Sequence, residues 1–155
     1  MPRVDLGGHP LAVAQYDWLS PDRHDRVDAD PHDVPVTPVP APSAEFRFTI
    51  HALPAPALAL VVFYPRYSRE KPPNLKEGDE VDCLTSPRCR ITENVDSVDI
   101  TVTGARRPRV AVLMVSYLAI LGPPEGVSSP EEGHSTPNRS TMNTASWDAL
   151  MEGSE

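Results

Sequence analysis

The sequence predicts a mostly disordered chain with a small, mainly β core of about four to five strands, an α+β core being the alternative. Apolar residues are concentrated in the middle: residues 45–122 hold 37 members of the set AVILMFWYC in 78 positions, whereas the two ends hold 24 in 77. Several apolar runs of this middle region alternate with polar residues at the period of two that β-strands have. The ends are rich in proline and acidic residues, a composition that disfavours a packed core.

Charge divides the chain at the same places. Of the formal net charge of −8, residues 1–44 carry −4, residues 45–122 carry +1 and residues 123–155 carry −5. An acidic chain does not favour nucleic acid as a partner. Because ordering one residue costs about 1–2 kcal/mol in backbone entropy alone, only the apolar middle is expected to fold. We therefore expect an acidic, proline-rich disordered tail, a small β-rich core, and a second disordered tail rich in Pro, Glu, Ser and Thr.

Three local patterns lie in the first of these regions. Pro10–Leu19 is compatible with a short helix that begins at its proline. Residues 22–33 contain five Asp and two His, but they lack the glycine and the terminal glutamate of a calcium-binding loop, so a solvated charge run is favoured over a metal site. Prolines at positions 35, 38, 40 and 42 predict a polyproline II spacer, with a PxxP ligand as the alternative.

Four strands are expected in the core from its apolar runs. Glu45–His51 and Ser97–Thr103 alternate between apolar and polar residues, the pattern of half-buried strands. Ala57–Tyr64 is a continuous apolar run of the right length for a buried strand. Val110–Leu121 is a longer apolar run, for which a central strand is preferred to a buried helix because β-branched residues recur in it. As a helix it would span about 18 Å, too short for a hydrocarbon core of about 30 Å.

A β-hairpin is expected about Ser86. In that register Cys83 lies opposite Cys89 on an apolar face, and Asp82 lies opposite Arg90. The two sulfur atoms would then be placed for a disulfide, but two reduced thiols are favoured because the chain shows no export signal. A zinc site would need two further ligands, and the five histidines are scattered, so no metal is expected.

The end of the chain holds the residues expected to bind a partner. Ser146 can cap a helical turn in which Trp147, Leu150 and Met151 share one face. Such a turn is too short to persist alone in water. It either packs back on the core or folds in a groove of a partner protein.

No motif for catalysis or cofactor binding is present: G-x-S-x-G, the P-loop, G-x-G-x-x-G, H-E-x-x-H and C-x-x-C are all missing. Neither a catalytic residue nor a cofactor is therefore predicted, and an enzyme ranks last. Three hypotheses remain. The favoured one is a non-enzymatic protein-interaction module with disordered tails and candidate phosphorylation sites at Ser129 and Thr136, each followed by proline. The second is a small secreted or viral structural β module with a Cys83–Cys89 disulfide, and the third is an open reading frame product without a selected stable fold.

The favoured hypothesis requires a protein partner, which the sequence does not name. No membrane span is expected, and the oligomeric state is not predicted. A cytoplasmic or other intracellular location is favoured because neither a signal peptide nor a transmembrane segment is recognised.

Overall fold

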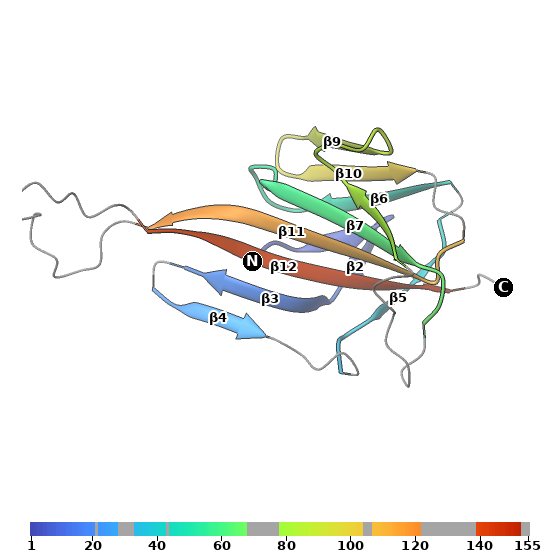
Figure 1. The fold of residues 1–155 in the computed structure, drawn as a ribbon, viewed down its shortest axis with the longest axis horizontal. Helices are drawn as coiled ribbons and strands as arrows, with labels where there is room; N and C mark the ends of the chain where they lie inside the picture. The colour runs from blue at the N-terminus through green and yellow to red at the C-terminus, as the bar shows by residue number, and fades with distance from the viewer. Residues whose placement is uncertain are drawn as a thin grey trace, which may run out of the picture.

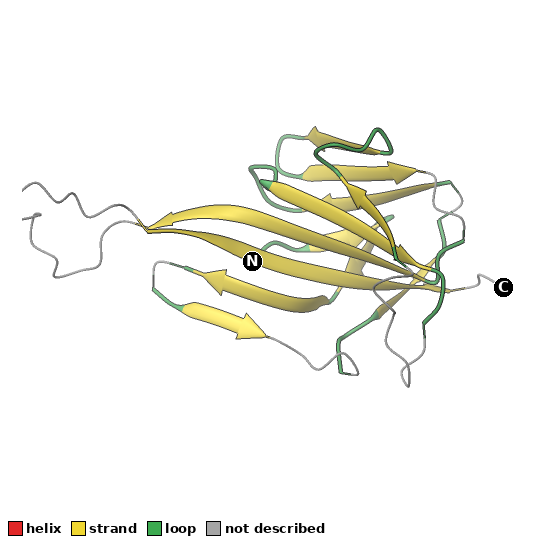
Figure 2. Ribbon diagram, viewed as in Figure 1, coloured by secondary structure: helices red, strands yellow, loops and turns green. Residues whose placement is uncertain are grey.

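In the part of the chain that the structure describes, twelve β-strands form two sheets that pack face to face (Figure 1). The computed structural model describes residues 1–20, 22–27, 33–42, 44–67, 78–103, 107–121 and 139–152, and none of these residues is helical (Figure 2). The expectation of a mostly disordered chain with four to five strands is therefore wrong. Strands from both ends of the chain take part in the sheets, because they supply buried apolar residues that a count over whole segments averages away.

The five-stranded sheet has the order β2-β1-β6-β10-β9, and neighbouring strands are antiparallel. Its strands are β1 (Val4–Leu6), β2 (His9–Leu11), β6 (Glu45–Ile50), β9 (Cys89–Glu93) and β10 (Val98–Thr103). Gly7 and Gly8 form the two-residue connection between β1 and β2, with φ of 57° and 83°. Positive φ at both central positions is what a tight hairpin turn requires, and glycine adopts it without steric cost.

The seven-stranded sheet has the order β4-β3-β12-β11-β7-β8, and β5 pairs in parallel with β12. Its strands are β3 (Val13–Leu19), β4 (His24–Val27), β5 (Thr37–Pro40), β7 (Leu58–Tyr64), β8 (Asp79–Asp82), β11 (Val110–Leu121) and β12 (Arg139–Glu152). The antiparallel pair of β11 and β12 lies in the middle of the sheet (Figure 1). One edge of β12 is shared, since β3 pairs with residues 144–147 and β5 with residues 149–152.

The main core lies between the two sheets. Phe46 of β6 and Phe63 of β7 join the sheets through tilted rings whose centroids are 4.9 Å apart. Trp147 of β12 is 1 % exposed and is the largest fully buried side chain among the described residues. Asn143 is buried as well, and its side-chain amide bonds both backbone groups of Leu19, at 2.9 Å and 3.1 Å. At the end of β3, the Asn143 side chain therefore makes the two backbone hydrogen bonds that a neighbouring strand would otherwise make.

The strands expected from the apolar runs of the core are confirmed as β6, β7, β10 and β11. The two expected helices are wrong, because Pro10–Leu19 forms β2 and β3 and residues 146–151 belong to β12. In β12 the buried apolar residues are Ala145, Trp147, Ala149 and Met151, at a period of two that the buried Asn143 continues. A separation of four positions, as between Trp147 and Met151, fits one face of a strand as well as one face of a helix.

The expected polyproline II spacer is wrong in part, because Thr37–Pro40 is β5. Proline is tolerated there because β5 is an edge strand with one unpaired side. Val39 lies between two prolines and is buried to 1 % exposure. The segment therefore contributes to the core instead of separating two parts of the chain.

The expected hairpin about Ser86 is also wrong. Strand β8 pairs with β7 and strand β9 pairs with β10, so the chain passes from one sheet to the other between them. Cys83 and Cys89 are joined by a disulfide across this passage. Asp82 does not pair with Arg90; its carboxylate accepts a hydrogen bond from the backbone of Leu84 at 3.0 Å. The apolar residues of β8 therefore join the core by pairing with β7, and those of β9 by pairing with β10, instead of by pairing of β8 with β9.

Strands β1, β6, β10 and β9 on one side, and β8, β7, β11, β12 and β5 on the other, have the strand order of a variable-type immunoglobulin sandwich. The departures are the additional strands β2, β3 and β4 and the position of the disulfide. In immunoglobulin domains the disulfide joins the strands equivalent to β6 and β11. Here the disulfide joins Cys83, just after β8, to Cys89, at the start of β9. A shared strand order carries no function, so function has to be argued from particular residues.

Candidate functional site

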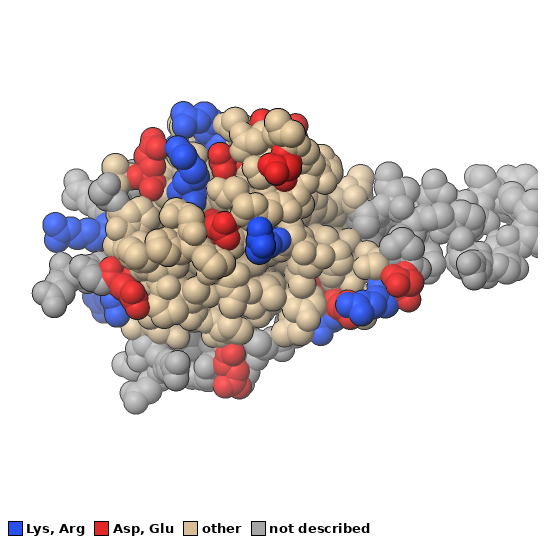
Figure 3. Space-filling view, turned by 180° about the vertical axis from the view of Figure 1, so that it is seen from behind, with Lys and Arg blue, Asp and Glu red and all other residues tan. Residues whose placement is uncertain are grey.

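The outer face of the five-stranded sheet is polar. Asp5, Thr49 and Asp99 lie in one row across β1, β6 and β10, and the Thr49 hydroxyl donates a hydrogen bond to Asp99 at 2.7 Å. The next row holds Arg47 and Arg90, which are exposed, on either side of the buried Thr101. The view from behind shows acidic and basic side chains interspersed on this side of the molecule (Figure 3). This sheet has the apolar inner face and polar outer face expected of a sheet in contact with water.

The outer face of the seven-stranded sheet is different. Strand pairing places its outward residues in cross-strand rows, namely Val62–Val112–Asp148, Leu60–Met114–Ser146, Leu58–Ser116–Thr144 and Leu118–Met142. We call Leu58, Leu60, Val112, Met114, Leu118 and Met142 the outer apolar face. Leu58 and Leu118 are 50 % and 58 % exposed, and Met114 and Met142 are 37 % and 38 % exposed.

Two strands cause this exposure. Residues 58–64 of β7 and 110–115 of β11 are apolar at every position, so both faces of each strand are apolar. Such strands are typical of sheets that are covered on both sides. The five-stranded sheet covers the inner side. At one end of the outer side Val62, Tyr64 and Val110 are buried, and Leu60, Val112, Tyr67 and Leu150 pack beside them. The other members of the outer apolar face, Leu58, Met114, Leu118 and Met142, are exposed.

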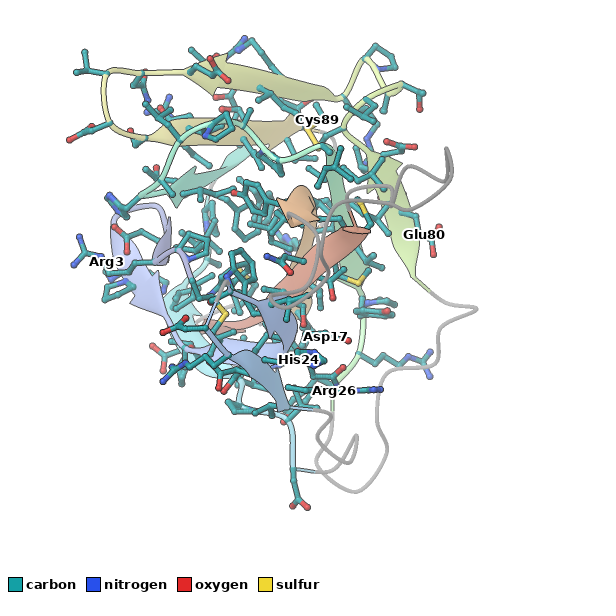
Figure 4. The ribbon with its side chains drawn as sticks, turned by 90° about the vertical axis from the view of Figure 1, so that its left-hand side faces the viewer. Arg3, Asp17, His24, Arg26, Glu80 and Cys89 are labelled. Carbon is teal, nitrogen blue, oxygen red and sulfur yellow. A yellow bond between two sulfur atoms is a disulfide. The ribbon has the colours of Figure 1, made fainter. Side chains whose placement is uncertain are left out.

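A shallow depression of about 330 Å³ lies beside the outer apolar face, over β3, β4, β11 and β12. Its lining is mixed: the polar members are Gln15, Asp17, Arg26, Ser116, Thr144 and Ser146, and the others are Tyr16, Val27, Met114, Val115 and Ala145. The imidazole of His24 is hydrogen-bonded to the Asp17 carboxylate at its rim. Figure 4 shows Asp17, His24 and Arg26 together at this edge of the sheet, on the same side of the molecule as Glu80 of β8.

A partly buried carboxylate, that of Asp148, lies on the same outer side. Asp148 is next to Val112 in the cross-strand row that continues to Val62 and Glu80. Burial raises the pKa of Asp148 to about 6, because the apolar surroundings disfavour its charged form. The pKa of Tyr64 is raised by burial and, to a smaller extent, by the negative charges of Asp148 and Glu80. A carboxylate with a raised pKa beside open apolar surface is a candidate for a functional position.

The residues that the sequence suggested for binding are placed differently. Trp147 and Met151 are buried between the sheets, with exposures of 1 % and 0 %. Leu150 lies on the outer side of β12, where it packs beside the buried cluster of Val62, Tyr64 and Val110. The helical turn on which these residues would have shared one face is a strand, so they do not form one binding surface. Ser129 and Thr136, the candidate phosphorylation sites, lie outside the described residues.

The residues of the outer apolar face were not singled out from the sequence. The signal that could have found them is the continuous apolar character of residues 58–64 and 110–115, which predicts two apolar faces for each strand. Asp148 carries no such signal, since the raised pKa depends on burial by strands that are distant in the sequence.

No family model, no curated protein and no solved structure matches this chain. The described part of the chain contains no group of three or more His, Cys, Asp or Glu side chains that could hold a metal ion. In that same part there is no helix of the length and apolar character needed to span a membrane. The exposed Leu and Met residues and the depression beside them make the outer side of the seven-stranded sheet the best-supported candidate site.

Proposed function

We propose that this chain is a non-enzymatic protein-interaction module that binds a partner on the outer apolar face of its seven-stranded sheet. The observation that carries the proposal is the contrast between the two sheets, one with a polar outer face and one with exposed Leu and Met side chains in adjacent rows. Contiguous exposed apolar surface of this kind is typical of protein-binding sites.

The chemistry of the face fits a protein partner. Complete burial of a Leu or Met side chain contributes about 1.5–3 kcal/mol, so covering even half of the exposed surface of four such residues stabilises a complex. Methionine adapts its flexible side chain to different partner surfaces. The depression beside the apolar rows contains hydroxyl, amide and carboxylate groups among its lining residues, and such groups can form hydrogen bonds at the rim of an interface.

The experiment compares two lysine substitutions in a selection of displayed peptides. Leu118→Lys changes the outer apolar face, whereas Leu84→Lys makes the same change at a leucine of similar exposure, 54 %, in the turn after β8. Peptides selected on the wild-type protein are expected to contain apolar anchors, to bind the Leu84→Lys variant and to lose binding to the Leu118→Lys variant. A selection without binders, or peptides that bind both variants equally, would contradict the proposal.

A structural β module is the second candidate, and the disulfide favours it. Cys83 and Cys89 connect the end of β8 in one sheet to the start of β9 in the other. Structural disulfides of this kind occur mainly in oxidising compartments. Trapping the thiols by alkylation at lysis tests this candidate: unmodified cysteines are expected if the disulfide is present in the cell, and alkylation of both would count against it.

A further inference from the structure

The exposed part of the outer apolar face is narrow. Its members lie on β7, β11 and β12, and we call them the open strip: Leu58, Met114, Leu118 and Met142. At a spacing of about 4.8 Å between neighbouring strands, β7 and β12 lie about 10 Å apart. Strand β8 borders the strip on one side, and the depression in which Asp17 and Arg26 carry opposite charges borders it on the other. A partner that covers the strip without crossing these borders is therefore about 10 Å wide.

The strip has a definite length as well. From the row of Leu118 and Met142 to the row of Val112 and Asp148, β12 advances by about six residues of about 3.3 Å each, or about 20 Å. Beyond the second row the outer side is covered, since Tyr64 is buried there. An α-helix rises about 1.5 Å per residue, so about 13 helical residues span this distance.

A partner on the open strip has to satisfy its own backbone hydrogen bonds. Strand β11 pairs with β12 along its whole length and with β7 from Val110 to Ser116, so its backbone groups in this range have partners within the sheet. A helix satisfies its backbone internally, and with its side chains it is about 10–12 Å wide, which matches the strip. A partner sheet needs about three strands or more to be stable, and it would extend over the charged borders. A single helix is therefore the element that fits.

The charged groups that border the strip on β8 and β12 are acidic. Glu80 and Asp82 face outward on β8, on either side of the buried Val81. Asp148 lies on β12, and strand pairing places it in one cross-strand row with Glu80. Among the described outward residues of β7, β8, β11 and β12 there is no Lys, Arg or His. Electrostatic complementarity therefore requires a partner with basic residues beside its apolar ones.

Asp148 has no cation partner among the described residues. Burial alone raises its pKa, and no described side chain donates a hydrogen bond to its carboxylate or pairs with it. Burial also raises the pKa of Tyr64, and the negative charges of Asp148 and Glu80 raise it further, so both acidic groups act on the same end of the strip. A carboxylate in partly apolar surroundings attracts a cation more strongly than an exposed carboxylate does, because the effective dielectric constant is lower.

We infer that the open strip binds an amphipathic α-helix of a partner protein, with apolar residues over the strip and with Lys or Arg residues that face Glu80, Asp82 and Asp148. The inference rests on the proposed function and names the chemistry of the partner. A helix that binds in this way presents apolar residues at intervals of three and four positions. A helix of about 13 residues is only marginally stable alone in water, so it is expected to gain helicity when it binds.

Selection from two displayed peptide libraries, with the full chain as the target, tests the inference. One library places apolar residues at intervals of three and four positions, and the other places them at every second position. Both libraries vary the remaining positions among Lys, Glu and Gln. We expect the binders that depend on Leu118 to come from the first library and to be enriched in Lys. Their helical circular dichroism is expected to increase when the full chain is added.

Variants of the full chain test the contacts of a selected peptide. Leu118→Lys is expected to raise Kd by more than about tenfold, because it places an ammonium group in the apolar contact. Asp148→Asn is expected to raise Kd about three- to tenfold, because the amide has no charge to pair with lysine. Asp96→Asn is the matched control in the exposed connection between β9 and β10, and it is expected to leave Kd unchanged. Urea unfolding confirms that each variant is folded.

The outcomes separate the inference from the proposed function. Leu118-dependent binders that come equally from both libraries, that favour Glu over Lys, or that bind Asp148→Asn as tightly as the wild type would overturn the inference and leave the proposed function standing. A selection without binders that depend on Leu118 would contradict both.

Sedimentation equilibrium of the chain alone tests a second copy as the occupant. The monomer mass of 16.9 kDa is expected for the wild type and for Leu118→Lys. Twice this mass in the wild type, with the monomer mass in Leu118→Lys, would assign the strip to self-association and overturn the inference.

Discussion

Asp148 is expected to lower the stability of the protein at neutral pH, and Asp148→Asn is expected to remove this effect. The carboxylate lies on β12 beside Val112, and burial is the cause of its raised pKa. Asparagine has nearly the same shape and can keep hydrogen bonds to the side chain, but it has no charge to be desolvated. The variant therefore isolates the cost of burying the charge.

The magnitude follows from the pKa shift. The pKa of Asp148 rises from 3.8 to about 6 on folding, and one pKa unit corresponds to about 1.4 kcal/mol, so the ionised carboxylate costs the folded state up to about 3 kcal/mol. Below pH 4 the group is protonated in both states, and the cost is absent. Because the folded protein binds the proton more tightly than the unfolded chain, stability decreases as the pH rises from about 4 to about 6 and then levels off.

Urea unfolding of the wild type and of Asp148→Asn between pH 4.5 and 8 measures this cost. We expect the variant to be more stable by about 2–3 kcal/mol at pH 7.5 and by clearly less at pH 4.5. Glu80→Gln is the matched control, since it removes a carboxylate from an exposed position at the end of the same row. An advantage of Asp148→Asn that is the same at both pH values, or no advantage at all, would refute burial of the charge.

Three further changes test the fold. Reduction of the Cys83–Cys89 disulfide opens a loop of seven residues and is expected to lower the free energy of unfolding by roughly 2.4 kcal/mol in the chain-entropy model, and an unchanged urea midpoint would contradict this. Asn143→Ala leaves the backbone N–H and C=O of Leu19 without their partner and is expected to cost about 1–3 kcal/mol; a loss within error of zero would show that water replaces the amide. Trp147→Ala removes the largest buried side chain and is expected to cost about 3–5 kcal/mol by thermal unfolding, whereas a loss under 1 kcal/mol would place Trp147 at the surface.

The strands that could be predicted from sequence are those whose pattern is local. Phe46, Phe48 and Ile50 alternate with polar residues, and the same alternation in either sheet would bury them. Strand β12 was missed because Trp147, Leu150 and Met151 also fit a helical face, and only pairing with β11 and β3 decides between the two periods. Burial of Trp147 depends on contacts with a segment more than a hundred positions away, since Val13 lies opposite it on β3.

The hairpin about Ser86 is a strand pairing that the sequence predicted and the structure does not contain. The cysteines do come together, but the disulfide joins two sheets instead of two strands of one hairpin. A local symmetry of apolar positions cannot distinguish these arrangements, because Val81 pairs with Val61 and Ile91 pairs with Ile100, both outside the symmetric segment. Prediction of pairing partners would have required knowledge of the whole sheet order.

The candidate site could be predicted only in part, because a local sequence pattern does not determine the order of strands and sheets. The continuous apolar run of β11 indicates a strand with two apolar faces, and the sequence therefore favoured burial on both. Which face stays open depends on the number of sheets that the chain forms. Leu118 is exposed because only one other sheet exists among the described residues, and it lies on the opposite side.

Hydrogen exchange of β12 in the full-length native protein tests most directly whether the terminal strands complete one sandwich. The amides of residues 143–151 lie between β11 on one side and β3 and β5 on the other, so they are expected to exchange as slowly as those of β10 and β11, through global unfolding. Exchange of residues 143–151 within seconds, while β6 and β10 stay protected, would show instead a small independent core with a separate C-terminal tail.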